Sequence, residues 1–240
     1  MIRLEPGNIH IWTEELDEEL EPTVWADNLA GILSSDEFKR AGAFRFEKDR
    51  HRFISARVIL RSILSYYVGM SPESLVFSYG LNGKPELDLK WVQFNVSHSA
   101  NLGVFAVSHT ERVGIDVEHI RSLEEDELTE ISRRYFPREE IAQLKNLPMR
   151  NKLEYFYRNW TILEATLKLE GSGFNELPDL ESGHSIYSKY FVKTFDVKPQ
   201  YMMSLASAKA PRRIVEFDKN ACRTLILSRN LALPHASVHS

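Results

Sequence analysis

Apolar residues recur every three or four positions in several stretches of the chain, a pattern that predicts helices with one buried face. The clearest examples are Glu47–Val68, whose opposite face carries arginines, and Met149–Leu169. Each stretch is followed by a glycine, Gly69 or Gly171, and glycine is the residue that most often terminates a helix. Shorter helices are expected after Ser34, around Leu128–Phe136 and over Arg138–Lys145.

Short runs that are apolar throughout or at alternate positions indicate strands. The predicted strands are Ile9–Trp12, Leu75–Tyr79, Val92–Val96, Leu102–Ser108, Arg112–Glu118, Ser188–Phe195, Tyr201–Ala206, Arg213–Phe217 and Thr224–Leu227. The fourth and fifth are expected to form a hairpin around His109–Glu111, and the Asn-Gly pair within Gly80–Pro85 predicts a turn. Each half of the chain thus combines helices with strands, an internal echo too faint to define a repeat.

The composition is that of an ordinary globular protein with a substantial hydrophobic core. The 240 residues are 43 % hydrophobic and 27 % charged, which suffices for one large domain or two small ones. The net charge of -4 does not favour nucleic acid as a partner. The segment Lys39–Arg61 nevertheless holds eight lysines and arginines against two acids, Glu47 and Asp49. A local basic segment in an acidic protein suits a small polyanion better than a long one.

No sequence feature indicates secretion or membrane insertion. Cys222 is the only cysteine, which excludes an internal disulfide and a cysteine-based zinc site and fits a reducing compartment. The N-terminus has no apolar signal-peptide core, and no apolar run approaches the ~20 residues of a membrane span. We therefore expect a cytoplasmic protein that acts without a membrane.

Two acidic residues near the middle of the chain are candidates for holding a cation. Asp116 and Glu118 are two positions apart on a predicted strand, so both side chains lie on one face. Two carboxylates on one face repel each other unless a cation or a base lies between them. Gly114, just before them, allows close approach of a backbone or a ligand. A bare Asp-x-Glu spacing is more often a solvated strand end, and both interpretations are open at this point.

The predicted helix Met149–Leu169 carries a second candidate pair, Glu164 and Lys168, four residues apart. This spacing is also that of an ordinary surface ion pair, worth ~0.3–0.5 kcal/mol. Apolar neighbours such as Trp160 and Leu167 predict that the helix is largely buried. A buried carboxylate needs a partner, and Lys168, a metal ion or both would serve.

Two basic residues lie at positions where ligand-binding groups are common. His98 is located where the strand Val92–Val96 gives way to a loop, and Lys84 lies in the turn Gly80–Pro85. Loop histidines and turn lysines are more often structural or simply exposed. Each of these signals is weak when taken alone.

The order and spacing of these residues are far more specific than any one of them. The chain resembles the 4'-phosphopantetheinyl transferases, specifically their longer, monomeric, surfactin-synthetase-type group, in three segments: Phe94-Asn95-Val96-Ser97-His98, Gly114-Ile115-Asp116-Val117-Glu118 and Trp160-Thr161-Ile162-Leu163-Glu164-Ala165-Thr166-Leu167-Lys168. The turn Asn82-Gly83-Lys84-Pro85 is similar to the Gly-Lys-Pro element of that family, and residues 40–61 are similar to its basic N-terminal helix. Leu163 departs from the family pattern, which usually has lysine there.

The resemblance, which covers roughly residues 35–207, implies an α+β fold of two similar subdomains. These would be related by a pseudo-twofold axis, with the coenzyme in the cleft between them. Residues 1–109 would supply contacts to the phosphates and adenine of coenzyme A. Residues 110–240 would hold the metal site and the catalytic helix.

The resemblance also implies a reaction and its residues. A monomer would transfer 4'-phosphopantetheine from coenzyme A to a serine of an apo acyl or peptidyl carrier protein and release 3',5'-ADP. Asp116, Glu118 and Glu164 would bind Mg²⁺. Glu164, directly or through a metal-bound water, or else Asp116, would accept the serine proton, and Lys168 would neutralise charge on the leaving group. Contacts to coenzyme A are implied for Arg40, Tyr79, Gly80, Leu81, Asn82, Gly83, Lys84, Asn95, Val96, Ser97, His98 and Lys168.

Carrier proteins are commonly acidic, so a basic rim would attract them. The candidates, which an ordinary solvated helix face explains equally well, are Arg133, Arg134, Arg138, Lys145, Arg150 and Lys152. The carrier would belong to fatty acid, polyketide or nonribosomal peptide biosynthesis, and the sequence does not choose among them. Two competing functions use the same residues: a Mg²⁺-dependent phosphohydrolase or nuclease, and a coenzyme A-binding protein that no longer transfers, for which Leu163 is the only motive.

Overall fold

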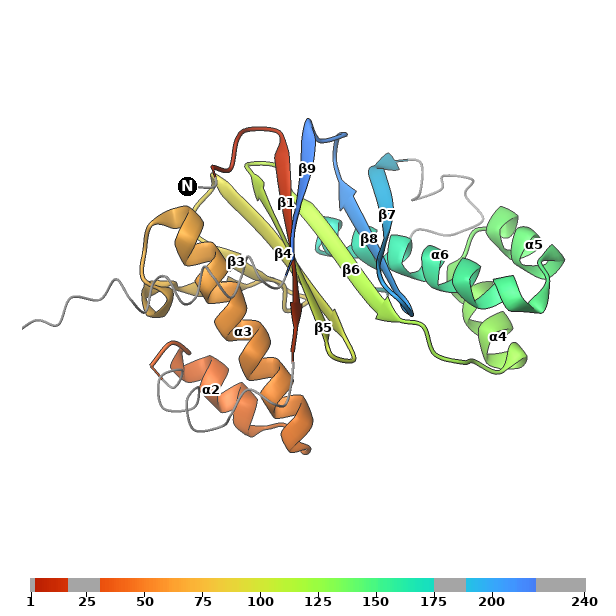
Figure 1. Ribbon diagram of the computed structural model, residues 1–240, viewed down its shortest axis with the longest axis horizontal. Coiled ribbons are helices and arrows are strands. Elements are labelled where there is room, and N and C mark those ends of the chain that lie inside the picture. The colour runs from red at the N-terminus through yellow and green to blue at the C-terminus, as the bar shows by residue number, and fades with distance from the viewer. Residues whose placement is uncertain (1–2, 17–30, 175–188, 219–240) are drawn as a thin grey trace, which may run out of the picture. The chain divides into compact units, whose positions relative to one another are not determined.

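The structure is a computed structural model that describes residues 3–16, 31–174 and 189–218 (Figure 1). Its helices are α2 (Ser35–Gly42), α3 (Glu47–Val68), α4 (Glu125–Tyr135), α5 (Arg138–Asn146) and α6 (Met149–Glu170), with a 3-10 turn at Pro72–Ser74. Its strands are β1 (Asn8–Glu15), β2 (Phe77–Tyr79), β3 (Pro85–Leu87), β4 (Val92–Ser99), β5 (Leu102–His109), β6 (Val113–His119), β7 (Phe191–Lys198), β8 (Tyr201–Ser207) and β9 (Arg213–Phe217). The predicted α+β class is confirmed, and the predicted strand Thr224–Leu227 lies outside the described residues.

The described strands form three sheets with the orders β4-β5-β1-β9, β2-β3 and β6-β8-β7. The predicted hairpin between β5 and β6 is wrong, because β5 pairs with β4 along its whole length and β6 pairs with β8. The turn between β4 and β5 has only two residues, and Ala100 in it adopts a left-handed conformation with φ 48°. Such two-residue turns are the connections that favour hairpins. The apolar pattern of β5 and β6 indicated strands correctly but carried no information about their partners.

The described chain divides into two compact units, which are considered separately here. Unit 1 comprises residues 1–11 and 77–215, and unit 2 comprises residues 12–76 and 216–240. In unit 1, residues of β1, β5, β6 and β8 form one hydrophobic cluster: Ile9, Ile11, Leu102, Val104, Ala106, Val113, Ile115, Val117, Met203 and Leu205. The helix α6 lies across β6 and β8 (Figure 1). The boundary expected between residues 109 and 110 divides the chain by sequence rather than by contacts, and it stays a prediction.

Unit 2 contains a buried ion-pair network that corrects one expectation about the basic segment Lys39–Arg61. Arg57 and Arg61 donate to the carboxylate of Glu37 at 2.6 and 2.8 Å, and Arg61 is completely buried. Glu37 also accepts the backbone N–H of Ser34 at the start of α2. These two arginines therefore hold α2 against α3 and do not belong to an exposed basic face.

Replacing Glu37 with glutamine is expected to lower the free energy of unfolding by about 3–5 kcal/mol, because it removes the buried negative charge that the guanidinium groups of Arg57 and Arg61 both contact. Burial raises the pKa of Glu37, but the N–H of Ser34 and the charges of Arg57 and Arg61 outweigh it, and the net pKa lies below the usual value of 4.5. The wild-type contribution is therefore present above that usual value and is lost as the pH falls through the lowered one.

Urea denaturation at neutral and acidic pH measures both effects. A matched control is Glu47→Gln, since Glu47 forms an exposed pair with Arg50 at 3.1 Å. Exposed pairs contribute at most about 1 kcal/mol. Equal losses of stability in the two variants at neutral pH would contradict the role given to Glu37.

Candidate functional site

The site begins with the alternation of side chains along β6. Ile115 and Val117 point into the hydrophobic cluster of unit 1, so Asp116 and Glu118 lie on the opposite face with Gly114. A Cβ atom on Gly114 would lie 2.0 Å from the carbonyl oxygen of Ala165 in α6. This face of β6 is therefore in direct backbone contact with α6, and the glycine is what allows it.

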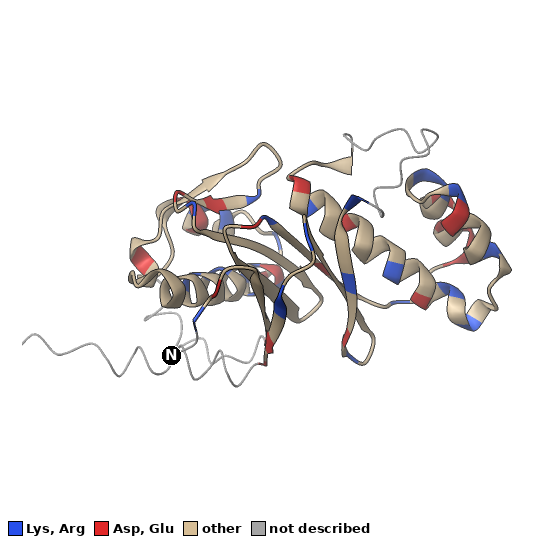
Figure 2. Ribbon diagram, turned by 90° about the horizontal axis from the view of Figure 1, so that it is seen from above, with Lys and Arg blue, Asp and Glu red and all other residues tan. Residues whose placement is uncertain are grey.

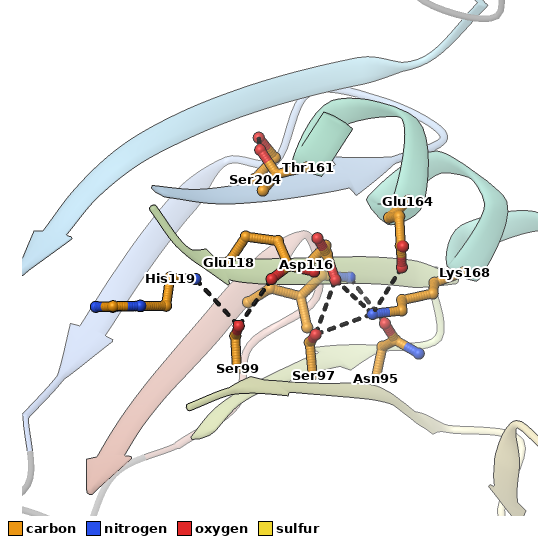
Figure 3. Close-up of polar contacts among 11 residues, drawn as sticks. Asn95, Ser97, Ser99, Asp116, Glu118, His119, Thr161, Glu164, Lys168 and Ser204 are labelled. Atoms are coloured by element: carbon orange, nitrogen blue, oxygen red, sulfur yellow. Dashed lines mark hydrogen bonds and ion pairs between the residues drawn. The ribbon is translucent and has the colours of Figure 1, made fainter. Parts of the chain in front are cut away.

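Asp116 is a buried carboxylate rather than part of a solvated strand end. The residue is only 1 % exposed. The Oδ1 atom accepts hydrogen bonds from the Ser97 hydroxyl at 2.8 Å and from the Lys168 ammonium at 2.5 Å (Figure 3). The Oδ2 atom is buried and has no hydrogen-bond donor among the described residues. Burying a carboxylate oxygen without a hydrogen-bond donor costs free energy, and a cation bound to that oxygen would offset the cost.

Glu118 and Glu164 add two carboxylates beside Asp116 (Figure 3). Glu118 accepts a hydrogen bond from the Ser99 hydroxyl at 2.7 Å, and burial is the largest cause of its raised pKa. Burial, followed by the charge of Asp116, raises the pKa of Glu164 to about 7. Three partly or fully buried carboxylates thus repel one another electrostatically. A bound cation would reduce this repulsion.

Lys168 places a positive charge among these carboxylates. Its Nζ atom lies 2.5 Å from Asp116 Oδ1, 3.6 Å from Glu164 Oε2 and 2.9 Å from the Ser97 hydroxyl. Burial lowers the pKa of Lys168, but the charges of Asp116 and Glu164 outweigh burial and raise it overall. The residue is therefore held as an ammonium ion in contact with the site.

The donor set fits Mg²⁺ in chemistry, since this ion prefers oxygen ligands and commonly takes only one or two from carboxylates. The partnerless Oδ2 of Asp116 supports the fit. Within residues 3–16, 31–174 and 189–218, no three histidine, cysteine, aspartate or glutamate side chains converge into a ready metal-binding group. Cation binding by Asp116, Glu118 and Glu164 therefore requires side-chain adjustment.

A cavity of about 420 Å³ opens beside two of the carboxylates. Phe156, Tyr157 and Trp160 of α6 form an aromatic wall, and charged side chains line the cavity as well: Glu118, Arg121, Glu127 and Glu164. The site therefore has next to it a cavity whose lining is partly charged and partly aromatic.

The strand β4 carries the predicted segment Asn95–His98 and reaches the site with alternate residues. Asn95 Oδ1 accepts the backbone N–H of Ile115 at 2.8 Å, and Ser97 contacts Asp116. Val96 and His98 alternate with them, and His98 is exposed. The structure thus brings Asn95 and Ser97 to the carboxylates and leaves His98 on the other face of the strand.

Ser99 is a site residue that the sequence interpretation missed. It donates to Glu118 and accepts the backbone N–H of His119 at 3.0 Å. The available signal was the repetition of small polar residues at positions 95, 97 and 99, two apart like the carboxylates of β6.

Of the predicted residues, Tyr79 ends β2, and Gly80, Leu81, Asn82, Gly83 and Lys84 form the turn to β3. Gly83 has φ +74°, as the Asn-Gly pair predicts, and residues 79–83 are exposed. Lys84 is different, because its ammonium donates to the backbone carbonyls of Lys168 and Val113 at 2.6 and 3.3 Å. Burial, followed by the charge of Arg112, lowers the pKa of Lys84 to about 8.

Arg40 belongs to unit 2, and its part in coenzyme binding stays a prediction. It lies in α2 and is exposed. Its guanidinium lies 5.4 Å from the centre of the Phe53 ring. The contact leaves the charged group at the surface of that unit.

Leu163, which replaces the usual family lysine, is completely buried. It packs with Leu167, Tyr135 and Phe174. An apolar side chain is what this interior position requires. The substitution is thus accommodated by packing and gives no reason to expect a loss of transfer.

Restoring lysine at this position is expected to destabilise the protein by about 3–5 kcal/mol, because the new ammonium would be buried without a partner. Leu163→Met is the matched control, since it conserves volume and should cost less than about 1.5 kcal/mol. Thermal unfolding and initial transfer rates of both variants are the measurements. Faster transfer by Leu163→Lys at unchanged stability would show that the position faces the substrates instead.

Comparison with known proteins agrees with this site. Residues 112–211 match the model of the 4'-phosphopantetheinyl transferase superfamily, and residues 21–110 match that of the 4'-phosphopantetheinyl transferase N-terminal domain. The chain therefore belongs to the 4'-phosphopantetheinyl transferase family, in the two-domain group typified by the surfactin-synthetase-type enzymes.

Three relatives show how close the similarity is. The chain is 40 % identical over 177 residues to the 4'-phosphopantetheinyl transferase HetI of a Nostoc species. The aligned residues cover 72 % of this chain and 73 % of HetI. It is 26 % identical over 201 residues to the 4'-phosphopantetheinyl transferase Sfp of Bacillus subtilis, covering 76 % and 85 % of the two chains. It is 30 % identical over 202 residues to the 4'-phosphopantetheinyl transferase psf-1 of Bacillus pumilus, covering 76 % and 82 %.

Proposed function

We propose that this chain transfers the 4'-phosphopantetheine group of coenzyme A to a serine hydroxyl of an apo acyl or peptidyl carrier protein. The serine oxygen forms a bond to the β-phosphorus, the bond from that phosphorus to the bridging oxygen breaks, and 3',5'-ADP leaves. The observation that carries the proposal is the cluster of Asp116, Glu118 and Glu164 with Lys168, which β6 and α6 build in a chain of this family.

Glu164 is the residue best suited to accept the serine proton. It lines the cavity beside the cluster, and in the site without a bound cation, burial, followed by the charge of Asp116, raises its pKa to about 7, which makes it a stronger proton acceptor than an ordinary carboxylate. Asp116 is less suited, because its Oδ1 already accepts hydrogen bonds from Ser97 and Lys168. Lys168 lies among the carboxylates with its charge retained, and it would stabilise the negative charge that develops on the departing phosphate.

Asp116, Glu118 and Glu164 would together hold Mg²⁺, which when bound supplies charge neutralisation of the pyrophosphate. The role of the protein is to place these carboxylates on two elements that meet at Gly114. The adjacent cavity of about 420 Å³, with its aromatic wall, suits the aliphatic and amide-linked arm of the transferred group.

The remaining contacts to coenzyme A are proposed from family membership. They comprise Arg40, the exposed residues Tyr79, Gly80, Leu81, Asn82 and Gly83 at and after the end of β2, and the β4 residues Asn95, Val96, Ser97 and His98. The pseudo-twofold relation between residues 1–109 and 110–240, the coenzyme cleft between them and the monomeric state belong to the same proposal. None of the helices in the described part of the chain is both long and apolar enough to cross a membrane.

The basic rim proposed to attract an acidic carrier contains five of the six basic residues that the sequence indicated. Arg133, Arg134, Arg138, Lys145 and Arg150 are exposed on α4, α5 and the start of α6. The sixth, Lys152, forms an ion pair with Glu125, with 2.6 Å between its ammonium nitrogen and a carboxylate oxygen. Figure 2 shows acidic residues on the same helices, so this surface is mixed in charge rather than uniformly basic.

Intact-mass spectrometry of a panel of apo carrier proteins tests the function. Each carrier is incubated with the protein, coenzyme A and Mg²⁺, and a parallel reaction contains EDTA. A metal-dependent gain of one phosphopantetheine on a carrier is the expected result. Binding of coenzyme A without any gain would favour a protein that binds but does not transfer, and release of phosphate or nucleotide without a modified carrier would favour a hydrolase.

A further inference from the structure

The last turn of α6 is held by side chains from outside the helix. A helix leaves the carbonyl groups of its final turn without donors of its own. Lys84 donates to the carbonyl of Lys168 at 2.6 Å, and Arg112 donates to that of Glu170 at 2.7 Å. The amide of Asn82 donates to the carbonyl of the following cap residue at 2.9 Å. Two of the three donors are cationic, which is the charge that the C-terminus of a helix favours.

Lys84 bonds to two elements at once. Besides the carbonyl of Lys168 in α6, its ammonium reaches the carbonyl of Val113, the first residue of β6, at 3.3 Å. Val113 is three residues before Asp116 on that strand. A single ammonium thus joins the helix and the strand that carry the catalytic carboxylates, close to where Lys168 contacts Asp116.

The junction that Lys84 joins has little tolerance for movement. The backbones of β6 and α6 touch at Gly114, where an added Cβ would lie 2.0 Å from the carbonyl oxygen of Ala165. Further toward the start of α6, the hydroxyls of Thr161 and Ser204 lie 2.8 Å apart and join the helix to β8. A slide or rotation of α6 at this junction would move Glu164 and Lys168 relative to Asp116.

We propose that Lys84 is a positioning residue, whose ammonium fixes the register of α6 on β6 and so places Glu164 and Lys168 opposite Asp116. It acts through the backbone of Lys168 and not as a ligand of a coenzyme phosphate. Two of the three N–H donors of the ammonium are already directed at carbonyl oxygens. The catalytic consequence rests on the transfer reaction proposed above, whereas the structural consequence does not.

The test compares Lys84→Met with Lys189→Met in the full-length protein. Both variants remove one lysine that contacts the end of α6, but Lys189 pairs with the side-chain carboxylate of Glu170, at 2.8 Å, and not with a backbone carbonyl. We expect Lys84→Met to lower kcat about 10- to 100-fold, the cost of a small misplacement of reacting groups, with KM for coenzyme A changed less than about threefold. Lys189→Met is expected to change kcat by less than about twofold, since its pair with Glu170 is exposed.

Hydrogen–deuterium exchange gives a readout that needs no activity. The last turn of α6 and the start of β6 should both exchange faster in Lys84→Met, whereas Lys189→Met should leave exchange at the start of β6 unchanged. Lys84→Arg, which keeps donors for both carbonyls, should restore most of kcat. Lys84→Gln replaces the methionine variant if the latter does not fold.

Three outcomes would overturn the proposal. The first is a rise of about tenfold or more in KM for coenzyme A at unchanged kcat, which is the signature of a binding contact. The second is an equal loss of kcat in the Lys84 and Lys189 variants. The third is unchanged exchange at the start of β6 in Lys84→Met. If wild-type protein modifies no carrier, the proposed function fails, and the exchange experiment still decides the place of Lys84.

Discussion

Replacing Glu164 with glutamine is expected to reduce carrier modification at least 10²- to 10⁴-fold, the range associated with loss of a general base. Glutamine keeps the size of the side chain but removes the proton acceptor and one carboxylate of the proposed metal-binding set. The repulsion that Asp116 and Glu118 exert on Glu164 disappears with the charge. The variant should therefore unfold at a temperature no lower than the wild type, which separates loss of chemistry from loss of fold.

Initial rates by intact-mass spectrometry and thermal unfolding by circular dichroism measure the two effects. Glu154→Gln is the matched control, because Glu154 lies on the same helix in an exposed pair with Arg158 at 3.5 Å. That control is expected to retain the wild-type rate within about twofold, as exposed pairs contribute little. Near-normal transfer by Glu164→Gln would remove Glu164 from both the base and the metal-binding assignments.

Gly114→Ala is the second change with a large expected effect, and it acts through backbone contact. The added Cβ would meet the carbonyl oxygen of Ala165 at 2.0 Å and the backbone nitrogen of Leu169 at 2.5 Å. Backbone atoms cannot rotate away as a flexible side chain does, so α6 must separate from β6. We expect a loss of about 3 kcal/mol or more in the free energy of unfolding, at or above the upper range for overpacked cores.

The same separation should reduce kcat far more than an equal destabilisation elsewhere, because Glu164 and Lys168 move with α6. Urea denaturation and transfer rates at a temperature where the variant is folded distinguish the two losses. Gly42→Ala serves as the control, since a Cβ on Gly42 meets nothing within 4 Å. Wild-type stability and rate in Gly114→Ala would show that β6 and α6 are not in backbone contact.

Local periodicity was sufficient to predict most elements and the outline of the site. Alternation along a strand put Asp116 and Glu118 on one face, and the four-residue spacing on a helix put Glu164 beside Lys168. Both relations are set by backbone geometry within one element, so no knowledge of tertiary partners was needed. The buried neighbours of α6 were also predictable, because its apolar residues outnumber its charges near Glu164.

Contacts between distant elements were not predictable in the same way. The partner of β6 is β8, some 90 residues away, and the apolar pattern of β5 fitted either partner equally well. Arg61 was assigned to the exposed arginine face of its helix because charged residues are usually exposed. In the structure it is buried, and its charge is paired there with the carboxylate of Glu37. The contacts of the Lys84 ammonium with the carbonyls of Lys168 and Val113 were not predictable either, since nothing in a turn sequence shows which backbone carbonyls an ammonium will reach.

The strands β4 and β6 are neighbouring edges of two different sheets, and side chains rather than backbone bonds join them. Asn95 and Ser99 accept N–H groups of β6, and Ser97 donates to Asp116. Folding therefore depends on Asn95, Ser97 and Ser99 as well as on the buried Val92 and Phe94 of the same strand. His98 is exposed, so a strong selective constraint found at that position would point to the coenzyme, and comparing its tolerance to mutation with that of Asn95 and Ser97 would separate the demands of folding from those of binding.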